Sequence, residues 1–247
     1  MPPPRRGRRA ACPSFFEGCP LLGERRPPER WCASATASAL GPRRRGQGES
    51  ILSGGMFQLV VDDEIALVLA EERHAQAMTD LIARNQDRLA RWEPWAEQRA
   101  TTESTRAYIH AALEDFVRGR QISTIIALER GRRFVGRCGI RINPYTGSGD
   151  IGYWIDADYE GHGITSRSAR ALVTTVFAEL GLARVELRTS VANTRSRALA
   201  ERLGFGLEGV LHGALQFAHR ADDVAFYSIT ASEWSSRYAA VTLPRSR

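Results

Sequence analysis

The sequence predicts a mixed α/β domain of the α+β class. Segments with β-strand patterning alternate with segments of helical periodicity from residue 56 onward, and no internal repeat is present. Hydrophobic residues make up 43% of the 247-residue chain, enough to build a sizeable core. The order of the segments, taken below from the N-terminus, favours seven strands and about four helices.

The first half of this region predicts two β-like segments and two helices. The β-like segments, residues 57–61 and 65–71, flank the acidic turn Asp62-Asp63-Glu64. A helical pattern over residues 74–89 is broken by Trp92-Glu-Pro-Trp95, because proline disfavours helix in the residue before it. A second helix follows a Thr/Ser cluster, with apolar residues at helical spacing up to residue 117.

The second half predicts further strands and two more helices. A hairpin of residues 123–129 and 134–143 turns at Arg130-Gly131, and another strand covers residues 149–155. An amphipathic helix then precedes a strand at 184–191, and Asn193 caps a helix that ends at Gly204. Strands at 206–211 and 223–230 complete the order.

Residues 1–55 differ sharply from the rest of the chain. They hold 10 of the 34 Arg, four of the 28 acidic residues and eight of the 11 Pro, whereas the rest has 24 Arg and 24 acidic residues. We therefore predict a disordered Arg/Pro-rich extension at 1–55 with Met56 as the alternative start, a folded domain at 56–238 and a flexible tail at 239–247. An RNA-binding role for the basic extension stays open.

Composition and charge narrow the functional classes. The domain itself has no net basic charge, so we expect no direct nucleic-acid binding by it. No apolar run approaches the roughly 18 residues of a membrane span, and no cysteine spacing is typical of a zinc site, so neither a membrane partner nor a metal is expected. The single thiol of the domain, Cys138, favours a cytoplasmic location.

A glycine-bearing loop, Tyr159-Glu-Gly-His-Gly-Ile-Thr165, connects a strand to an amphipathic helix. Main-chain N–H groups at the start of a helix lack helical partners and lie at the positive end of the helix dipole. Glycine at 161 and 163 would let a phosphate approach the main chain closely. The loop therefore predicts either a phosphate site or an ordinary turn.

Four motifs in this order resemble the GNAT acetyltransferases, and more narrowly those of the RimJ/RimL type, which acetylate the N-termini of ribosomal proteins. The motifs are Asp150-Ile-Gly-Tyr-Trp154, Tyr159-Glu-Gly-His-Gly-Ile164, Asn193-x-x-Ser196 and Arg202-Leu-Gly-Phe205. The resemblance covers roughly residues 56–234. It implies a central, mostly antiparallel seven-stranded sheet with a splayed-strand cofactor cleft, acetyl-CoA as cosubstrate, and direct attack of an amine on the thioester in a bacterial cytoplasmic enzyme.

The resemblance also implies which residues bind acetyl-CoA. The pantetheine arm would lie along the main chain of residues 153–155, the pyrophosphate would bind the amides of residues 161–165, and Asn193 would either bind the arm or only cap its helix. Arg167 and Arg170 would reach the phosphates or remain solvated. The implied cofactor-binding residues are Tyr153, Trp154, Ile155, Gly161, His162, Gly163, Ile164, Thr165, Arg167 and Asn193.

For catalysis, Ser196 matches the position of a general acid for the departing thiolate. A base is also needed, because an α-amine with a pKa of about 7.7–8.0 is largely protonated at neutral pH. Leu215 stands where the RimL branch carries a glutamate base, so Asp150 is our first substitute. The weaker candidates are Glu103, Asp222, Asp223 and His212.

Trp92 and Trp95 would line the acceptor cleft, although packing in the core or in a homodimer interface is the alternative. The favoured acceptor is the N-terminal α-amine of a protein such as a ribosomal protein. Two alternatives stay open: acetylation of a small amine, such as a polyamine or an aminoglycoside-like compound, and a non-catalytic acyl-CoA-binding module.

Overall fold

The structure is a computed structural model that describes residues 57–238; of Arg130 only the main chain is described. The predicted extension at 1–55, Met56 and the predicted tail at 239–247 lie outside the described residues. None of the described helices combines the length and the apolar character that spanning a bilayer requires.

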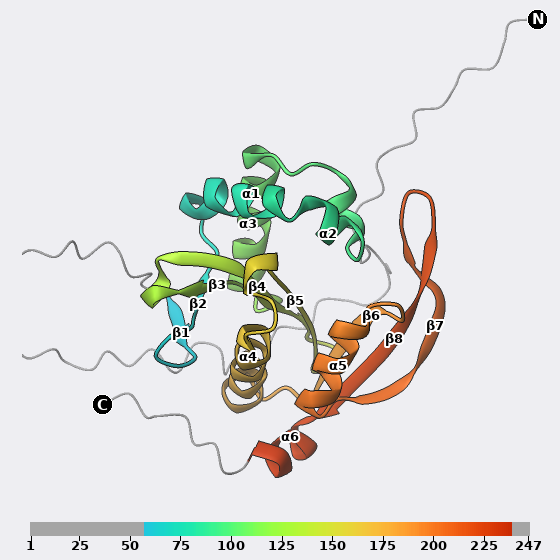
Figure 1. The fold of residues 1–247 in the computed structure, drawn as a ribbon. Helices are drawn as coiled ribbons and strands as arrows, with labels where there is room; N and C mark the ends of the chain where they lie inside the picture. The colour runs from blue at the N-terminus through green and yellow to red at the C-terminus, as the bar shows by residue number, and fades with distance from the viewer. Residues whose placement is uncertain (1–56, 239–247) are drawn as a thin grey trace, which may run out of the picture. The chain divides into compact units, whose positions relative to one another are not determined.

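The described chain forms one eight-stranded sheet in the order β1-β2-β3-β4-β5-β6-β8-β7 (Figure 1). The strands are β1 (Gln58–Val60), β2 (Ala66–Leu69), β3 (Gln121–Leu128), β4 (Arg133–Asn143), β5 (Ser148–Ile155), β6 (Arg184–Ser190), β7 (Gly206–Gln216) and β8 (Ala221–Thr230). All neighbours are antiparallel except β5 and β6, which confirms a mostly antiparallel sheet. The expected count of seven strands is wrong by one, because all eight segments with strand patterning form strands.

Six α-helices accompany the sheet in the described chain, rather than about four. They are α1 (Ala75–Arg84), α2 (Gln86–Ala90), α3 (Thr102–Val117), α4 (Ile164–Leu180), α5 (Thr194–Leu203) and α6 (Ala231–Tyr238). The helix expected at 74–89 divides at Asn85, whose φ and ψ of −110° and 10° leave the helical region. Helix α6 was not expected; Trp234 anchors it by burial and by donating to Thr174 Oγ1 at 3.1 Å.

The helices cover the two faces of the sheet separately (Figure 1). The larger core joins α4, α5 and α6 to one face, through residues such as Leu172, Leu203 and Tyr227. Smaller clusters join α1, α2 and α3 to the other face, where Met78 and Ile109 pack on Ile125. Each fully buried side chain of this size stabilises the fold by about 1.5–3 kcal/mol.

Strands β5 and β6 separate along their length. Their pairing is limited to residues 148–150 of β5 and 184–186 of β6, although β5 continues to Ile155 and β6 to Ser190. Over the same stretch β5 remains paired with β4. The central sheet is therefore open on the β6 side of β5 beyond Asp150, as the splayed-strand prediction requires.

Candidate active site

The open edge of β5 presents main-chain groups to the space beside β6. Asp156 N donates to Val135 O at 2.7 Å, which directs residue 156 toward β4. Because successive residues of a strand direct their main-chain groups to alternate edges, those of Tyr153 and Ile155 point away from β4. This edge matches the requirement of an extended ligand that carries amide groups.

The glycine loop follows β5 and a 3₁₀ turn, η5 (Ala157–Tyr159), and ends at the start of α4. Gly161 and Gly163 have φ of +82° and +71°, a region that side-chain-bearing residues rarely adopt. A Cβ at either position would meet no atom within 4 Å, so the space in front of both is open. Helix α4 has no side-chain cap, which leaves its first N–H groups available to an anion.

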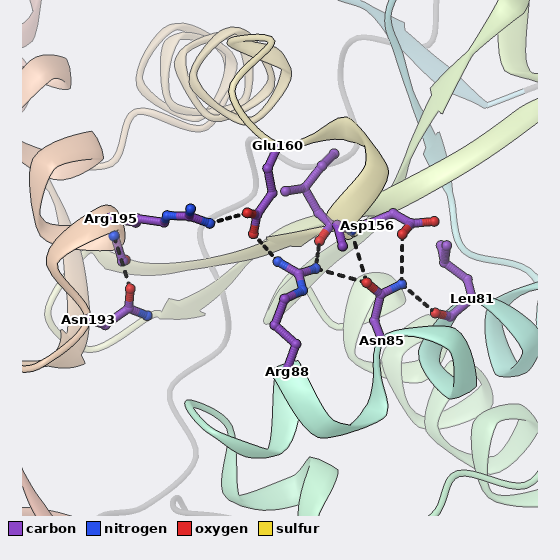
Figure 2. Close-up of polar contacts among 10 residues, drawn as sticks. Leu81, Asn85, Arg88, Asp156, Glu160, Asn193 and Arg195 are labelled. Carbon is purple, nitrogen blue, oxygen red and sulfur yellow. Dashed lines mark hydrogen bonds and ion pairs between the residues drawn. The ribbon is translucent and has the colours of Figure 1, made fainter.

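Glu160, which directly precedes Gly161, lies between two arginines (Figure 2). Arg88 of α2 reaches it from one side and Arg195 of α5 from the other. Arg88 also donates to the main-chain oxygen of Ile155 at the end of β5. These ion pairs connect the loop before α4 to a helix on each side of the opening.

Asn85 holds the other end of this network in place (Figure 2). Its Nδ2 donates to Leu81 O at 2.9 Å and to Asp156 Oδ1 at 3.1 Å. Its Oδ1 accepts from Ala157 N at 3.0 Å and from Arg88 Nη2 at 3.0 Å. Because Asn85 is buried and uses both amide atoms, it fixes the chain between β5 and the glycine loop.

Two hydroxyl groups meet beside the opening, on the face of β5 that α5 covers. Tyr153 OH lies 3.2 Å from Ser196 Oγ. Burial raises the pKa of the Tyr153 hydroxyl, so this group keeps its proton at neutral pH and can donate it. The structure thus brings two predicted site residues together, although only the main chain of Tyr153 was expected to matter.

Asn193 caps the N-terminus of α5, as predicted for an asparagine directly before a helix. Its Oδ1 accepts from Ser196 N at 3.1 Å. Its Nδ2 donates to no residue of the described chain, so capping does not exclude a hydrogen bond to a pantetheine arm. The predicted arm contact stays a prediction.

Asp150 faces the opposite side of the sheet from Tyr153, since side chains three apart on a strand point to opposite faces. It lies across from Arg141 of β4 and Glu186 of β6 in the strand registers. Burial raises the pKa of the Asp150 carboxyl to about 6, whereas Arg188 lowers it. At pH 7 the group is therefore ionised and still more basic than an ordinary aspartate, which suits a general base.

Glu93 is a further acidic group of this face, which the sequence offers only as one of several acidic residues that leave open an acidic cleft for a cationic acceptor. It precedes the 3₁₀ turn η3 (Pro94–Glu97), and its Oε2 accepts from Trp95 Nε1 at 2.9 Å. Burial raises the pKa of the Glu93 carboxyl, which interacts electrostatically with Arg137, Arg141 and Asp150. The one signal in the sequence was an acid between two tryptophans and beside a proline.

The two tryptophans belong to none of the described core clusters. The Trp95 side chain is 48% exposed and Trp92 is half-buried with Arg91 over its ring. The β7–β8 hairpin approaches this segment, where Ala218 N donates to Glu97 Oε2 at 2.9 Å. A position at the edge of an acceptor site fits both tryptophans, and their substrate contact stays a prediction.

The other predicted phosphate and base residues lie elsewhere. Arg167 is held by Asp62 and Glu64, each at 2.8 Å, so a phosphate contact would compete with these carboxylates. That contact stays a prediction, as does one by the exposed Arg170. His162 is exposed in the glycine loop.

Among the weaker base candidates, Asp223 accepts from Gly213 N and interacts with His212, contacts that lower the pKa of its carboxyl. Asp222 accepts from Ser190 and Arg220, and Glu103 is exposed in the first turn of α3. The contacts of Asp222 and Asp223 hold both carboxyls in place, and the role of Asp150 as the base stays a prediction.

Comparisons with known proteins agree with this geometry. Residues 64–206 match the family described as "Acetyltransferase (GNAT) domain". The chain is 33% identical over 184 residues to the Bacillus subtilis (strain 168) protein named "Putative ribosomal N-acetyltransferase YdaF", covering 72% of this chain and 98% of that protein. It is 28% identical over 169 residues to the ribosomal-protein-serine acetyltransferase of Escherichia coli (strain K12), covering 68% and 93%.

A solved structure of RimL, the ribosomal L7/L12 alpha-N-protein acetyltransferase, in complex with coenzyme A superposes with a TM-score of 0.68 at 27% identity, covering 70% of this chain and 98% of that one. The fold with its splayed strand and glycine loop thus defines an acyltransferase. The chain belongs to the GNAT acetyltransferase family. It is an N-acetyltransferase with acetyl-CoA as cosubstrate, similar to proteins of the RimJ/RimL type.

Proposed function

We propose that the protein transfers the acetyl group of acetyl-CoA to the N-terminal α-amine of a protein, such as a ribosomal protein. One observation carries the proposal: β5 carries a basic carboxylate, Asp150, on one face and the Tyr153–Ser196 hydroxyl pair on the other, beside its open edge. The names of the relatives support a ribosomal-protein acceptor. An acceptor of this kind would place the reaction in the cytoplasm.

The residues present fit acetyl-CoA, which supplies an acetyl group activated as a thioester. The open space at Gly161 and Gly163 admits the pyrophosphate to the amides of residues 161–165. The main-chain groups of Tyr153, the main-chain N–H of Ile155 and the Nδ2 of Asn193, which donates to no described residue, suit the pantetheine arm. Trp154 directs no group at the arm, because its ring is buried against α1 and α2 and its main-chain groups point toward β4.

Asp150 removes a proton from the acceptor's ammonium group, which frees the nitrogen lone pair to attack the thioester carbonyl. The main-chain N–H of Tyr153 stabilises the charge that develops on the carbonyl oxygen. As the C–N bond forms and the C–S bond breaks, Ser196 gives its proton to the thiolate, and Tyr153 replaces that proton through their hydrogen bond. The second proton, which the acceptor nitrogen loses as the amide forms, passes through water to the Tyr153 oxygen and restores its hydroxyl. Asp150, with a pKa of about 6, returns its proton to water at neutral pH.

The test is thiol release from acetyl-CoA by the full chain, with ribosomal-protein N-terminal peptides, spermidine and an aminoglycoside as separate acceptors. We expect turnover on at least one peptide, with the acetyl group on the α-nitrogen by tandem mass spectrometry. The same peptide with a blocked N-terminus is the control and should give none. Turnover on spermidine or the aminoglycoside alone would instead indicate a small-amine acetyltransferase. Acetyl-CoA binding without turnover on any acceptor would contradict the proposal.

A further inference from the structure

The face of β5 that carries Asp150 has an open space in its middle. Gly152 lies between Asp150 and Trp154 on this face, and its position is exposed although β5 is a central strand of the sheet. A Cβ at Gly152 would meet no atom within 4 Å. Its cross-strand neighbour on β4 is Gly139, which adds no side chain over it. Glycine inside a strand often marks a place where another chain or a ligand approaches closely.

The Glu93 carboxyl lies within electrostatic range of the same part of the sheet. The groups with which its carboxyl interacts are Asp150, Arg141 and Arg137. In the register of β4 and β5, Arg141 pairs with Asp150 and Arg137 pairs with Trp154, so these positions lie on either side of Gly152. The half-buried carboxyl of Glu93 is therefore within electrostatic range of residues on both sides of the open space.

One oxygen of the Glu93 carboxyl, Oε1, has no hydrogen-bond donor among the described residues. Trp95 occupies Oε2, whereas Oε1 accepts no hydrogen bond from any described residue, and no described cation forms an ion pair with Glu93 within 4 Å. Glu93 is half-buried, and a carboxylate that is partly withdrawn from water is costly to keep without a hydrogen-bonded cation. A ligand that carries a cation would supply the missing partner.

We propose that Glu93 and the space above Gly152 form the subsite for the acceptor's ammonium group and first residue. This inference rests on the proposed function and adds a specificity-determining residue to it. Glu93 binds the ammonium group from the η3 side, and Gly152 leaves room for the main chain that follows. Asp150 then takes the proton, because it lies at the edge where β5 and β6 separate.

The test compares wild type with Glu93→Gln in the full chain. Glutamine keeps the size of the side chain and an oxygen for Trp95, and it removes only the charge. We expect the KM for the acceptor to rise about 10- to 100-fold, the range for one hydrogen bond to a charged group. The kcat and the KM for acetyl-CoA should stay within about twofold. Glu114→Gln, an exposed change on α3, is the control.

A second measurement separates binding from structural effects and does not depend on turnover. A ribosomal-protein N-terminal peptide and its analogue with hydrogen in place of the amine are each titrated into the protein with coenzyme A present. Glu93→Gln should weaken only the peptide that carries the amine. Three results would overturn the subsite. They are an equal loss of affinity for both peptides, no loss of affinity for either peptide, and a loss of kcat at an unchanged acceptor KM.

Gly152→Val tests the space itself, because the added side chain fits the sheet and fills the region above it. We expect weaker peptide binding with unchanged coenzyme A binding, and Gly152→Ala offers a milder version if the valine variant fails to fold. Full peptide affinity in a folded Gly152→Val variant would contradict the proposal. Failure of the proposed function is a different result, in which wild type binds acetyl-CoA and acetylates no amine.

Discussion

Replacing Asp150 by asparagine should raise the stability of the domain while it removes activity. Burial raises the pKa of the Asp150 carboxyl from its usual 3.8 to about 6. Between about pH 4 and pH 6 the folded chain therefore binds more protons than the unfolded chain, and its stability falls as the pH rises through this window. The difference between the two pKa values corresponds to about 3 kcal/mol at pH 7, an upper limit because the group keeps some solvent contact.

Urea unfolding of wild type and Asp150→Asn at pH 4 and pH 7 measures this effect. Asparagine does not ionise, so the variant should gain up to about 3 kcal/mol over wild type at pH 7 and little at pH 4. Asp63→Asn, a change at an exposed turn position, controls for the general effect of removing a carboxylate. An advantage of Asp150→Asn that is the same at both pH values, or absent, would refute the reasoning.

The same variant tests the base. The kcat/KM of wild type should rise with pH around a midpoint of about 6, and Asp150→Asn should lower it about 100- to 10,000-fold while leaving the Kd for acetyl-CoA unchanged. A wild-type profile with no inflection near pH 6, or a variant that keeps full turnover, would remove Asp150 from the mechanism.

Three further predictions follow from the site. Gly161→Val should weaken acetyl-CoA binding by at least about tenfold in calorimetry without unfolding the domain, because it fills the open space at a φ of +82°; unchanged affinity would make the loop a plain turn. Tyr153→Phe removes the hydroxyl behind Ser196 and should lower kcat more than either KM, and equal losses in kcat and acetyl-CoA affinity would instead indicate a packing role. Asn85→Ala leaves several buried polar groups without partners and should cost about 2–4 kcal/mol in urea unfolding; a loss under about 1 kcal/mol would mean that water replaces them.

Local features of the chain could be predicted from the sequence, because they depend on residues that are close together in the sequence. The glycine loop, the start of α4 and the Asn193 cap of α5 each arise from a few consecutive residues. The order of strands and helices follows from periodicity, and the motif resemblance predicted the separation of β5 from β6.

Departures from the predicted elements come from contacts between distant residues. Helix 74–89 divides at Asn85 because its side chain is used by Asp156 and Ala157, more than 70 positions away. Strand β7 continues to Gln216 rather than ending near residue 211, because it pairs with β8 as far as Ala221. Periodicity within a segment carries no information about such partners.

The sequence by itself determined the family, the glycine loop before α4 and the element order, since each is encoded in short motifs. Only the tertiary structure decided which side chains meet: Tyr153 with Ser196 across 43 positions, and Arg88 and Arg195 with Glu160. It also decided the basicity of Asp150, because the pKa of a carboxyl depends on how far burial removes it from water and on which charges surround it.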